Sequence, residues 1–296
     1  MKVGEQGTRW GVEQRLEFIE FRLFWEGGVN RSDITSYFGV SVPQASNDLA
    51  RYQERAPNNI VYDTSGKRYL AGKRFRPIFR KPDADRYLSH LAATSDKVTT
   101  LSESWLAAPP AFDTLPIPHR RIDPAILRDL LSATREKRSL HIHYQSLTRA
   151  DATWRWITPH AFGSDGMRWH ARAFCHQDRT FKDFLLPRFL EVEADGEAGA
   201  AAIADTVWQE FIDVKLEPHP QMSASQRRVV ALDFGMQNES VSVKVRLALL
   251  YYFLKRLNLD GDAERRAPRE QHIVLGNKAE VRAALKRAEE QTPLAA

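Results

Sequence analysis

The chain has 296 residues, of which 43% are hydrophobic and 10% aromatic, so it is long enough for two or three domains with apolar cores and does not have the composition of a disordered protein. It has no run of about 18 apolar residues and no apolar N-terminal signal segment, so we expect a cytoplasmic protein without a membrane partner. The single cysteine, Cys175, excludes an intramolecular disulfide and a zinc cluster built on cysteines.

The net charge of +5 is concentrated at the start of the chain. Residues 1–82 contain 14 Lys and Arg against 9 Asp and Glu, whereas the remaining residues contain 29 of each sign. A local excess of cations is typical of a surface that neutralises phosphates. This region is therefore the first place to look for contact with nucleic acid.

The N-terminal region predicts a helix-turn-helix. A broad apolar face indicates a supporting helix from about residue 12 to 25, which Gly27 and Gly28 end. A short amphipathic helix begins near Asn30, and Gly39 stops it because glycine adopts positive φ without strain. Ser41 then caps a third helix, with a proline in its first turn, where the missing N–H costs nothing.

The third helix, residues 41–52, carries the side chains that we expect to contact duplex DNA. Helical spacing places Val42, Ala45, Leu49 and Tyr52 on the inward face. The outward side chains are short or forked hydrogen-bonding groups, which can reach base edges and phosphates from a helix in the major groove. Together with the N-cap they are Ser41, Gln44, Ser46, Asn47 and Arg51.

A wing is predicted behind this helix. Two β-prone runs, residues 60–62 and 67–70, flank a turn at residues 64–66, which places Lys67 and Arg68 at the tip. From residue 64 to 82 there are seven basic residues and no acidic one. A charge run alone is more typical of a solvated linker, but its position directly after a wing favours contact with phosphates.

The rest of the chain falls into segments with different sequence patterns. Residues 83–137 read as a helical linker, with helices at about 83–93 and 123–137 around a Pro-rich junction near 107–118. The period then changes to two, and runs at about 140–147, 152–162, 168–176 and 181–192 predict a small antiparallel β-barrel. We therefore expect an α+β multidomain protein with a DNA-binding domain (1–82), a linker (83–137), a barrel (138–195) and a C-terminal domain (205–296).

Strand alternation suggests a polar patch on the barrel. If the even-numbered positions of the strands meet on one face, they bring together Tyr, Ser, His and Arg side chains beside Trp154 and Trp156. Arginine makes bidentate contacts with phosphate, and aromatic faces stack on bases, so the patch suits a phosphate with an attached base. The alternative is an ordinary half-buried sheet. The polar members are Tyr144, Ser146, His160, His170, Arg172 and Arg188.

Metal binding and catalysis have weaker support. His141 and His143 share one strand face, but no cysteine or carboxylate pair completes a zinc site, and we expect them on the face opposite to the Arg/Tyr patch. Cys175 and His176 are adjacent, so their side chains point to opposite faces and cannot pair as nucleophile and base. The sequence also lacks a Gly-rich phosphate loop. We expect neither a catalytic residue nor a cofactor or metal.

Several separated motifs resemble those of WYL-domain transcriptional regulators. The segment 168–173 lies where that family has its Trp-Tyr-Leu tripeptide, and His170 and Ala171 replace the Tyr and Leu. Supporting motifs lie at residues 144–146, 159–161 and 181–184, the last leading to Arg188. In its order of domains the chain further resembles the regulators found beside bacterial anti-phage defence operons such as BREX and CBASS.

The resemblance implies an N-terminal winged helix-turn-helix, a central Sm/SH3-like WYL barrel and a C-terminal extension that pairs subunits. It implies a homodimeric repressor of an inverted-repeat operator in double-stranded DNA. The implied effector is a nucleotide, a cyclic oligonucleotide or a single-stranded nucleic acid, bound by the six patch residues named above. From the residues alone, an activator, a nucleic-acid-binding effector without promoter specificity, and a hydrolase acting on nucleotides stay open.

Overall fold

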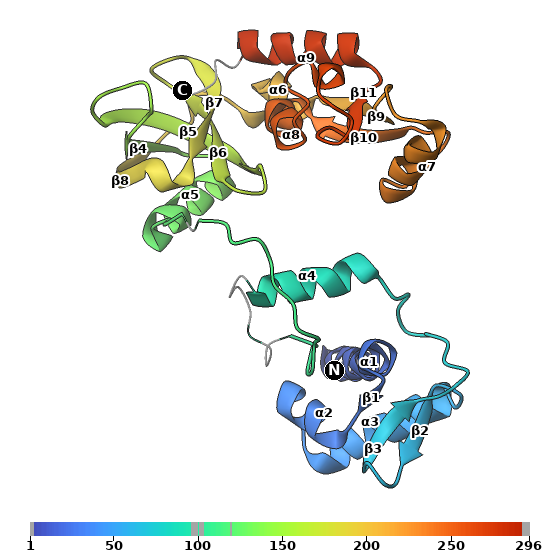
Figure 1. Ribbon diagram of the computed structural model, residues 1–296. Coiled ribbons are helices and arrows are strands. Elements are labelled where there is room, and N and C mark those ends of the chain that lie inside the picture. The colour runs from blue at the N-terminus through green and yellow to red at the C-terminus, as the bar shows by residue number, and fades with distance from the viewer. Residues whose placement is uncertain (1–2, 96–99, 101–103, 119, 292–296) are drawn as a thin grey trace. The chain divides into compact units, whose positions relative to one another are not determined.

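The computed structural model describes residues 3–95, 100, 104–118 and 120–291. The chain forms two compact units, residues 1–117 and 118–296 (Figure 1), and each is described by itself. In the described part of the chain, no helix combines the length and the apolar character that crossing a membrane requires.

The first unit is a helix-turn-helix followed by a wing, as predicted. A three-stranded sheet has the order β1-β3-β2, with β2 and β3 joined by the wing turn. One hydrophobic core joins the helices and the sheet and is centred on Phe18, Leu49 and Tyr52. The elements are α1 (Val3–Glu26), β1 (Gly28–Val29), α2 (Arg31–Phe38), α3 (Val42–Arg55), β2 (Ile60–Asp63), β3 (Arg68–Ala71) and α4 (Ala84–Ser95).

Local chemistry sets the boundaries of the two short helices. Asn30 caps α2 through a capping box with Asp33, in which each side chain accepts a hydrogen bond from the other residue's backbone N–H. Gly39 ends α2 with φ of 65°, a conformation in which any side chain would be strained. The Oγ of Ser41 accepts from the backbone N–H of Gln44 and begins α3. The predicted turn between the helices is confirmed.

The second unit begins with α5 (Pro124–Glu136), which Asp123 caps, and continues into a five-stranded antiparallel sheet. We call it the central sheet, and its strand order is β7-β6-β5-β4-β8. The expectation of one strand over 181–192 is wrong: Pro187, which has no N–H to donate, lies in a 3₁₀ turn that separates two strands. The strands are β4 (Ser139–Tyr144), β5 (Thr153–Ser164), β6 (Trp169–Cys175), β7 (Thr180–Leu185) and β8 (Phe189–Gly196).

The central sheet has two different faces. Its core face packs with α5 around one hydrophobic cluster that includes Ile142, Tyr144, Ala173 and Phe184. Its outer face carries the alternate side chains, among them Arg172 on β6. A register shift between Pro159 and Ala161 leaves His160 as the extra residue of a bulge in β5. The bulge changes which positions of β5 belong to each face.

The C-terminal part of the second unit is a three-stranded sheet of order β10-β9-β11 with helices packed against it. The apolar segment 241–257 contains a strand, a 3₁₀ turn and a short helix, and its Leu247, Leu250 and Leu254 side chains are buried. The elements are α6 (Thr206–Gln209), β9 (Phe211–Pro218), α7 (Ala224–Asp233), β10 (Val241–Arg246), α8 (Leu250–Arg256), β11 (Ile273–Leu275) and α9 (Lys278–Gln291).

Candidate DNA-binding and effector sites

The exposed face of α3 carries the side chains that helical spacing predicts there. Ala45, Leu49 and Tyr52 are buried, and Asn47 and Arg51 are exposed. Val42, which we expected on the inward face, is 56% exposed, because it lies in the first turn beyond the edge of the core. The two exposed polar side chains are one turn apart, so they share a face that a DNA groove can reach.

Two of the other expected DNA contacts are partly engaged within the helix. Gln44 donates from Nε2 to Asp48 Oδ1 at 3.0 Å, and Ser46 donates from Oγ to the carbonyl of Val42 at 3.0 Å. Asp48 is itself fully buried and accepts from Arg15 Nε on α1 at 2.6 Å. A carboxylate can only accept, so it fixes the orientation of the Gln44 amide. The role of Asp48 has no signal in the local sequence, because its partner Arg15 lies 33 residues away.

The two cations predicted at the wing tip, Lys67 and Arg68, have different surroundings. Lys67 occupies the turn between β2 and β3 with φ of 49° and is exposed. Arg68 begins β3, and its guanidinium lies against the backbone of Gly28, close enough that a side chain at that glycine would collide with it. Lys67 is therefore the freer of the two predicted wing contacts.

The basic segment after the wing is held to the fold and is not a free linker. Glu20 on α1 is buried, and its carboxylate accepts hydrogen bonds from the backbone N–H groups of Ile78, Phe79 and Arg80 at 2.8 to 3.0 Å. Asn59 makes a reciprocal pair of hydrogen bonds with the backbone of Arg76. These contacts give the cations of this segment a fixed place in the DNA-binding unit.

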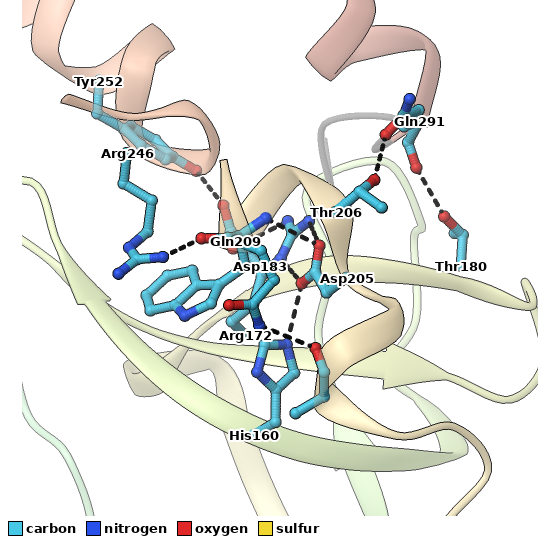
Figure 2. A network of polar contacts seen from close by, with 12 residues as sticks. His160, Arg172, Thr180, Asp183, Asp205, Thr206, Gln209, Arg246, Tyr252 and Gln291 are labelled. Carbon is cyan, nitrogen blue, oxygen red and sulfur yellow. Dashed lines mark hydrogen bonds and ion pairs between the residues drawn. The ribbon is translucent and has the colours of Figure 1, made fainter. Parts of the chain in front are cut away.

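On the outer face of the central sheet, Arg172 is the centre of a buried ionic network (Figure 2). It is 1% exposed, and it forms a bidentate pair with Asp205 through Nε at 2.7 Å and Nη2 at 2.9 Å. Its Nη1 lies 3.3 Å from Asp183, which also accepts from the hydroxyl of Tyr252. His160 Nε2 lies 2.9 Å from Asp205 Oδ2, the oxygen that also accepts from Arg172 Nε. The network joins the central sheet to α6 and α8.

Asp205 belongs to this network although no local sequence pattern marks it, since Arg172 lies 33 residues away. It caps α6, and its carboxylate is 1% exposed. Burial alone would raise the pKa of Asp205, but hydrogen bonds from Arg172 and His160 outweigh burial and lower that pKa to about 2. The Asp205 carboxylate and the Arg172 guanidinium are therefore both charged at neutral pH. Two carboxylates already neutralise Arg172, which places this cation in a structural ion pair.

The expectation that the six patch residues share one face is wrong. In the register of β4 and β5, Trp156 pairs with His141 and Trp154 with His143, whereas Tyr144 pairs with Thr153. Cross-strand partners share a face, so even-numbered positions of β4 do not meet even-numbered positions of β5. Tyr144 faces the core, where its ring contacts Phe184 and Phe189. His160, His170 and Arg172 instead belong to the outer face.

The remaining residues of the predicted patch also lie in different parts of the sheet. Arg188 lies beside the hydroxyl of Tyr144 on the core side. Ser146 lies beyond the end of β4, where its hydroxyl hydrogen-bonds Thr148. His170 is 5% exposed, and its Nε2 has no hydrogen-bond partner among the described residues, with Asp165 at 3.8 Å. Burial lowers the pKa of His170, although Asp183 and Asp165 oppose this, so the ring is neutral at pH 7.

His141 and His143 stack with the two tryptophans on the outer face. The ring of His143 lies 4.9 Å from that of Trp154, and His141 lies 4.9 Å from both indoles. They are opposite to Tyr144, as expected, but they share the outer face with Arg172, so only half of that expectation is correct. No group of three or more metal-ligating side chains occurs among the described residues.

Comparisons with known proteins agree with this three-part architecture. Residues 11–93 match the BrxR transcriptional regulator winged helix-turn-helix domain, residues 125–194 the WYL domain, and residues 211–281 the BrxR transcriptional regulator C-terminal dimerization domain. The DNA-binding transcriptional repressor CapW of Escherichia coli strain KTE188 is 38% identical over 96% of this chain and 95% of its own length.

Two further relatives carry the same description. CapW of Stenotrophomonas maltophilia is 39% identical over 94% of both chains. CapW of Pseudomonas aeruginosa is 38% identical over 94% of this chain and 93% of its own. The matched relatives are named as regulators and not as enzymes, and the matched domains include one for DNA binding and one for dimerization.

Proposed function

The chain belongs to the family of DNA-binding transcriptional repressors represented by CapW, and from that premise we propose a homodimeric repressor whose α3 reads an inverted-repeat operator. An effector that is a nucleotide, a cyclic oligonucleotide or a single-stranded nucleic acid binds the central sheet and releases the operator. The controlled genes are those of a phage-defence operon, as the resemblance to such regulators implies. The protein acts in the cytoplasm, where these genes are transcribed.

One observation carries the DNA-binding half of this proposal. Asn47 and Arg51 are exposed on α3, and the exposed Lys67 extends from the wing of the same unit. The helix supplies hydrogen-bonding groups for base edges, while the wing supplies charge for phosphates. With two subunits related by a two-fold axis, the recognition helices would lie about one DNA turn apart, roughly 34 Å.

The decisive experiment is a gel-shift titration at physiological salt against the DNA upstream of the chain's own gene and against the same DNA scrambled. We expect at least about a thousandfold preference for the upstream DNA, which is the lower end of the range of specific regulators. Equal affinities would replace the repressor by a nucleic-acid-binding protein without promoter specificity. A reporter gene behind the upstream DNA would separate repression from activation.

Variants assign the roles of single side chains. Arg51→Glu should abolish operator binding, whereas the matched charge reversal Arg128→Glu, on the exposed side of α5, should leave operator binding within twofold. Asn47→Ala should weaken binding to the operator more than to scrambled DNA. Lys67→Ala should weaken both alike and reduce the salt slope by about one. Operator binding that survives Arg51→Glu would show that α3 does not enter the groove.

A further inference from the structure

Gln44 lies at the N-terminal end of the polar stripe on α3. Its backbone N–H donates to the Oγ of the N-cap residue Ser41, so it belongs to the first turn of the helix, and its side chain is half-buried. The exposed Asn47 and Arg51 follow three and seven residues later, a spacing that places all three side chains on one face. The first turn of a helix that lies in the major groove is the part that contacts base edges.

The buried Asp48 side chain fixes the orientation of the Gln44 amide. Its Oδ1 accepts from Gln44 Nε2 at 3.0 Å. Asp48 is 0% exposed, and Arg15 on α1 holds its carboxylate in place, with Nε 2.6 Å from Oδ2 and Nη2 3.4 Å from Oδ1. Because a carboxylate offers only acceptors, the NH₂ group of Gln44 must face Asp48 and the Gln44 oxygen must face away from it. The fold of the protein thus sets which of its two orientations this amide takes.

The part of the Gln44 amide that Asp48 leaves free consists of one acceptor and one donor. Among the described residues, none donates to Oε1, and Nε2 keeps a second hydrogen besides the one given to Asp48. In the major groove, adenine presents its N6 amino donor beside the N7 acceptor. Guanine presents two acceptors there, and cytosine and thymine each present one hydrogen-bonding group. Adenine is therefore the base whose edge matches both free groups of this amide.

We propose that Gln44 recognises an adenine in each half-site of the operator, with Oε1 accepting from N6–H and Nε2 donating to N7, and that Asp48 is the positioning residue for this contact. The inference rests on the proposed function, in which α3 enters the major groove. An amide already held in one orientation loses less conformational freedom on binding than a free one. The contact therefore gains affinity for adenine and discriminates against bases that need the opposite orientation.

The test selects binding sites from a pool of DNA duplexes with a randomised central segment, using the full-length protein and its variants at one salt concentration. We expect the parent motif to contain an A·T pair in each half-site whose replacement weakens binding at least about tenfold. Gln44→Met keeps the length of the side chain but removes both polar groups, so it should lose the preference at that pair alone. Asp48→Asn can face Gln44 with an oxygen or an NH₂ group, and its preference should be intermediate.

A modified base tests the contact at the level of one atom. Replacing the selected adenine by 7-deazaadenine removes the N7 acceptor and keeps the N6 amino group. In a gel shift, this replacement should weaken binding of the parent protein about fivefold, as expected for the loss of one hydrogen bond, and leave binding of Gln44→Met unchanged. The comparison stands even if Asp48→Asn, which leaves Arg15 without a carboxylate, lowers the stability of the protein.

The matched control is Gln53→Met, the same substitution at an exposed position of the same helix. Nine residues at about 100° each place Gln53 on the opposite side of α3 from Gln44, so the selected motif should not change. A motif that Gln44→Met leaves intact, or a uniform loss of affinity for all sequences, would overturn the adenine contact and leave the proposed repressor standing. A parent protein that selects no motif at all would overturn both proposals.

Discussion

Arg172 and Arg155 are both buried arginines of the central sheet, but they face opposite sides and have opposite surroundings. On the outer face, Arg172 is bound by two carboxylates that come from β7 and from the start of α6. On the core face, Arg155 touches a hydroxyl and an aromatic ring, with no described carboxylate in ion-pair distance. The difference teaches that burial of a cation does not identify its role, whereas the state of its anionic partners does.

The largest expected effect is on folding stability when Arg172 is lost. Arg172→Met leaves Asp205 and Asp183 buried without their cation, and we expect the free energy of unfolding to fall by about 3 to 5 kcal/mol. Urea denaturation measures it. Arg138→Met, which removes two half-exposed ion pairs with Glu136 and Asp195, should cost less than about 1 kcal/mol. A similar small loss for Arg172→Met would contradict a structural role for the network.

The second effect concerns pH. The pKa of Asp205 is lowered to about 2 from an ordinary value of 3.8, so the carboxylate stabilises the fold above about pH 4 and loses this contribution as the pH falls toward 2. The difference corresponds to about 2 kcal/mol. We expect the free energy of unfolding to drop more between pH 5 and pH 2 in the parent protein than in Asp205→Asn. Parallel pH profiles would contradict the ionised network.

The smallest expected effect on the free energy of unfolding is that of replacing Arg155. Arg155→Met replaces an uncompensated buried cation by an apolar side chain of similar length, so the free energy of unfolding should change by no more than about 1 kcal/mol, and toward greater stability. The same urea experiment measures it. A loss as large as that expected for Arg172→Met would show that Arg155 has a stabilising partner, and the contrast between the two faces would disappear.

The sequence predicts local features of this protein well. The outward position of Asn47 and Arg51 follows from the helical period, and the ends of α2 follow from Asn30 and Gly39, which act within a few residues. The wing follows from a turn between two β-prone runs. In each case the determining contact spans only a short stretch of chain, so it can be inferred without knowing the fold.

The faces of the central sheet could not be predicted in this way. Which face Tyr144 occupies depends on the register between β4 and β5, and the bulge at His160 shifts the faces again along β5. Neither feature has a signal in strand alternation. Asp205 lies 33 residues from Arg172 in sequence, and only the folded second unit brings them together. The predicted patch therefore placed on one face a set of polar side chains that the folded sheet divides between two faces.

The Glu20 carboxylate has a consequence for how related chains can vary in length. Because it binds three successive backbone amides, the stretch from Asn59 through the wing must return to α1 at a fixed residue. We expect insertions to be tolerated at the exposed turn of residues 64–67, which has no contact with Glu20, whereas one extra residue between Gly72 and Ile78 would place the wrong backbone amides next to the Glu20 carboxylate. Among related chains, insertions and deletions should therefore occur at the hairpin tip and be rare in the segment between Gly72 and Ile78.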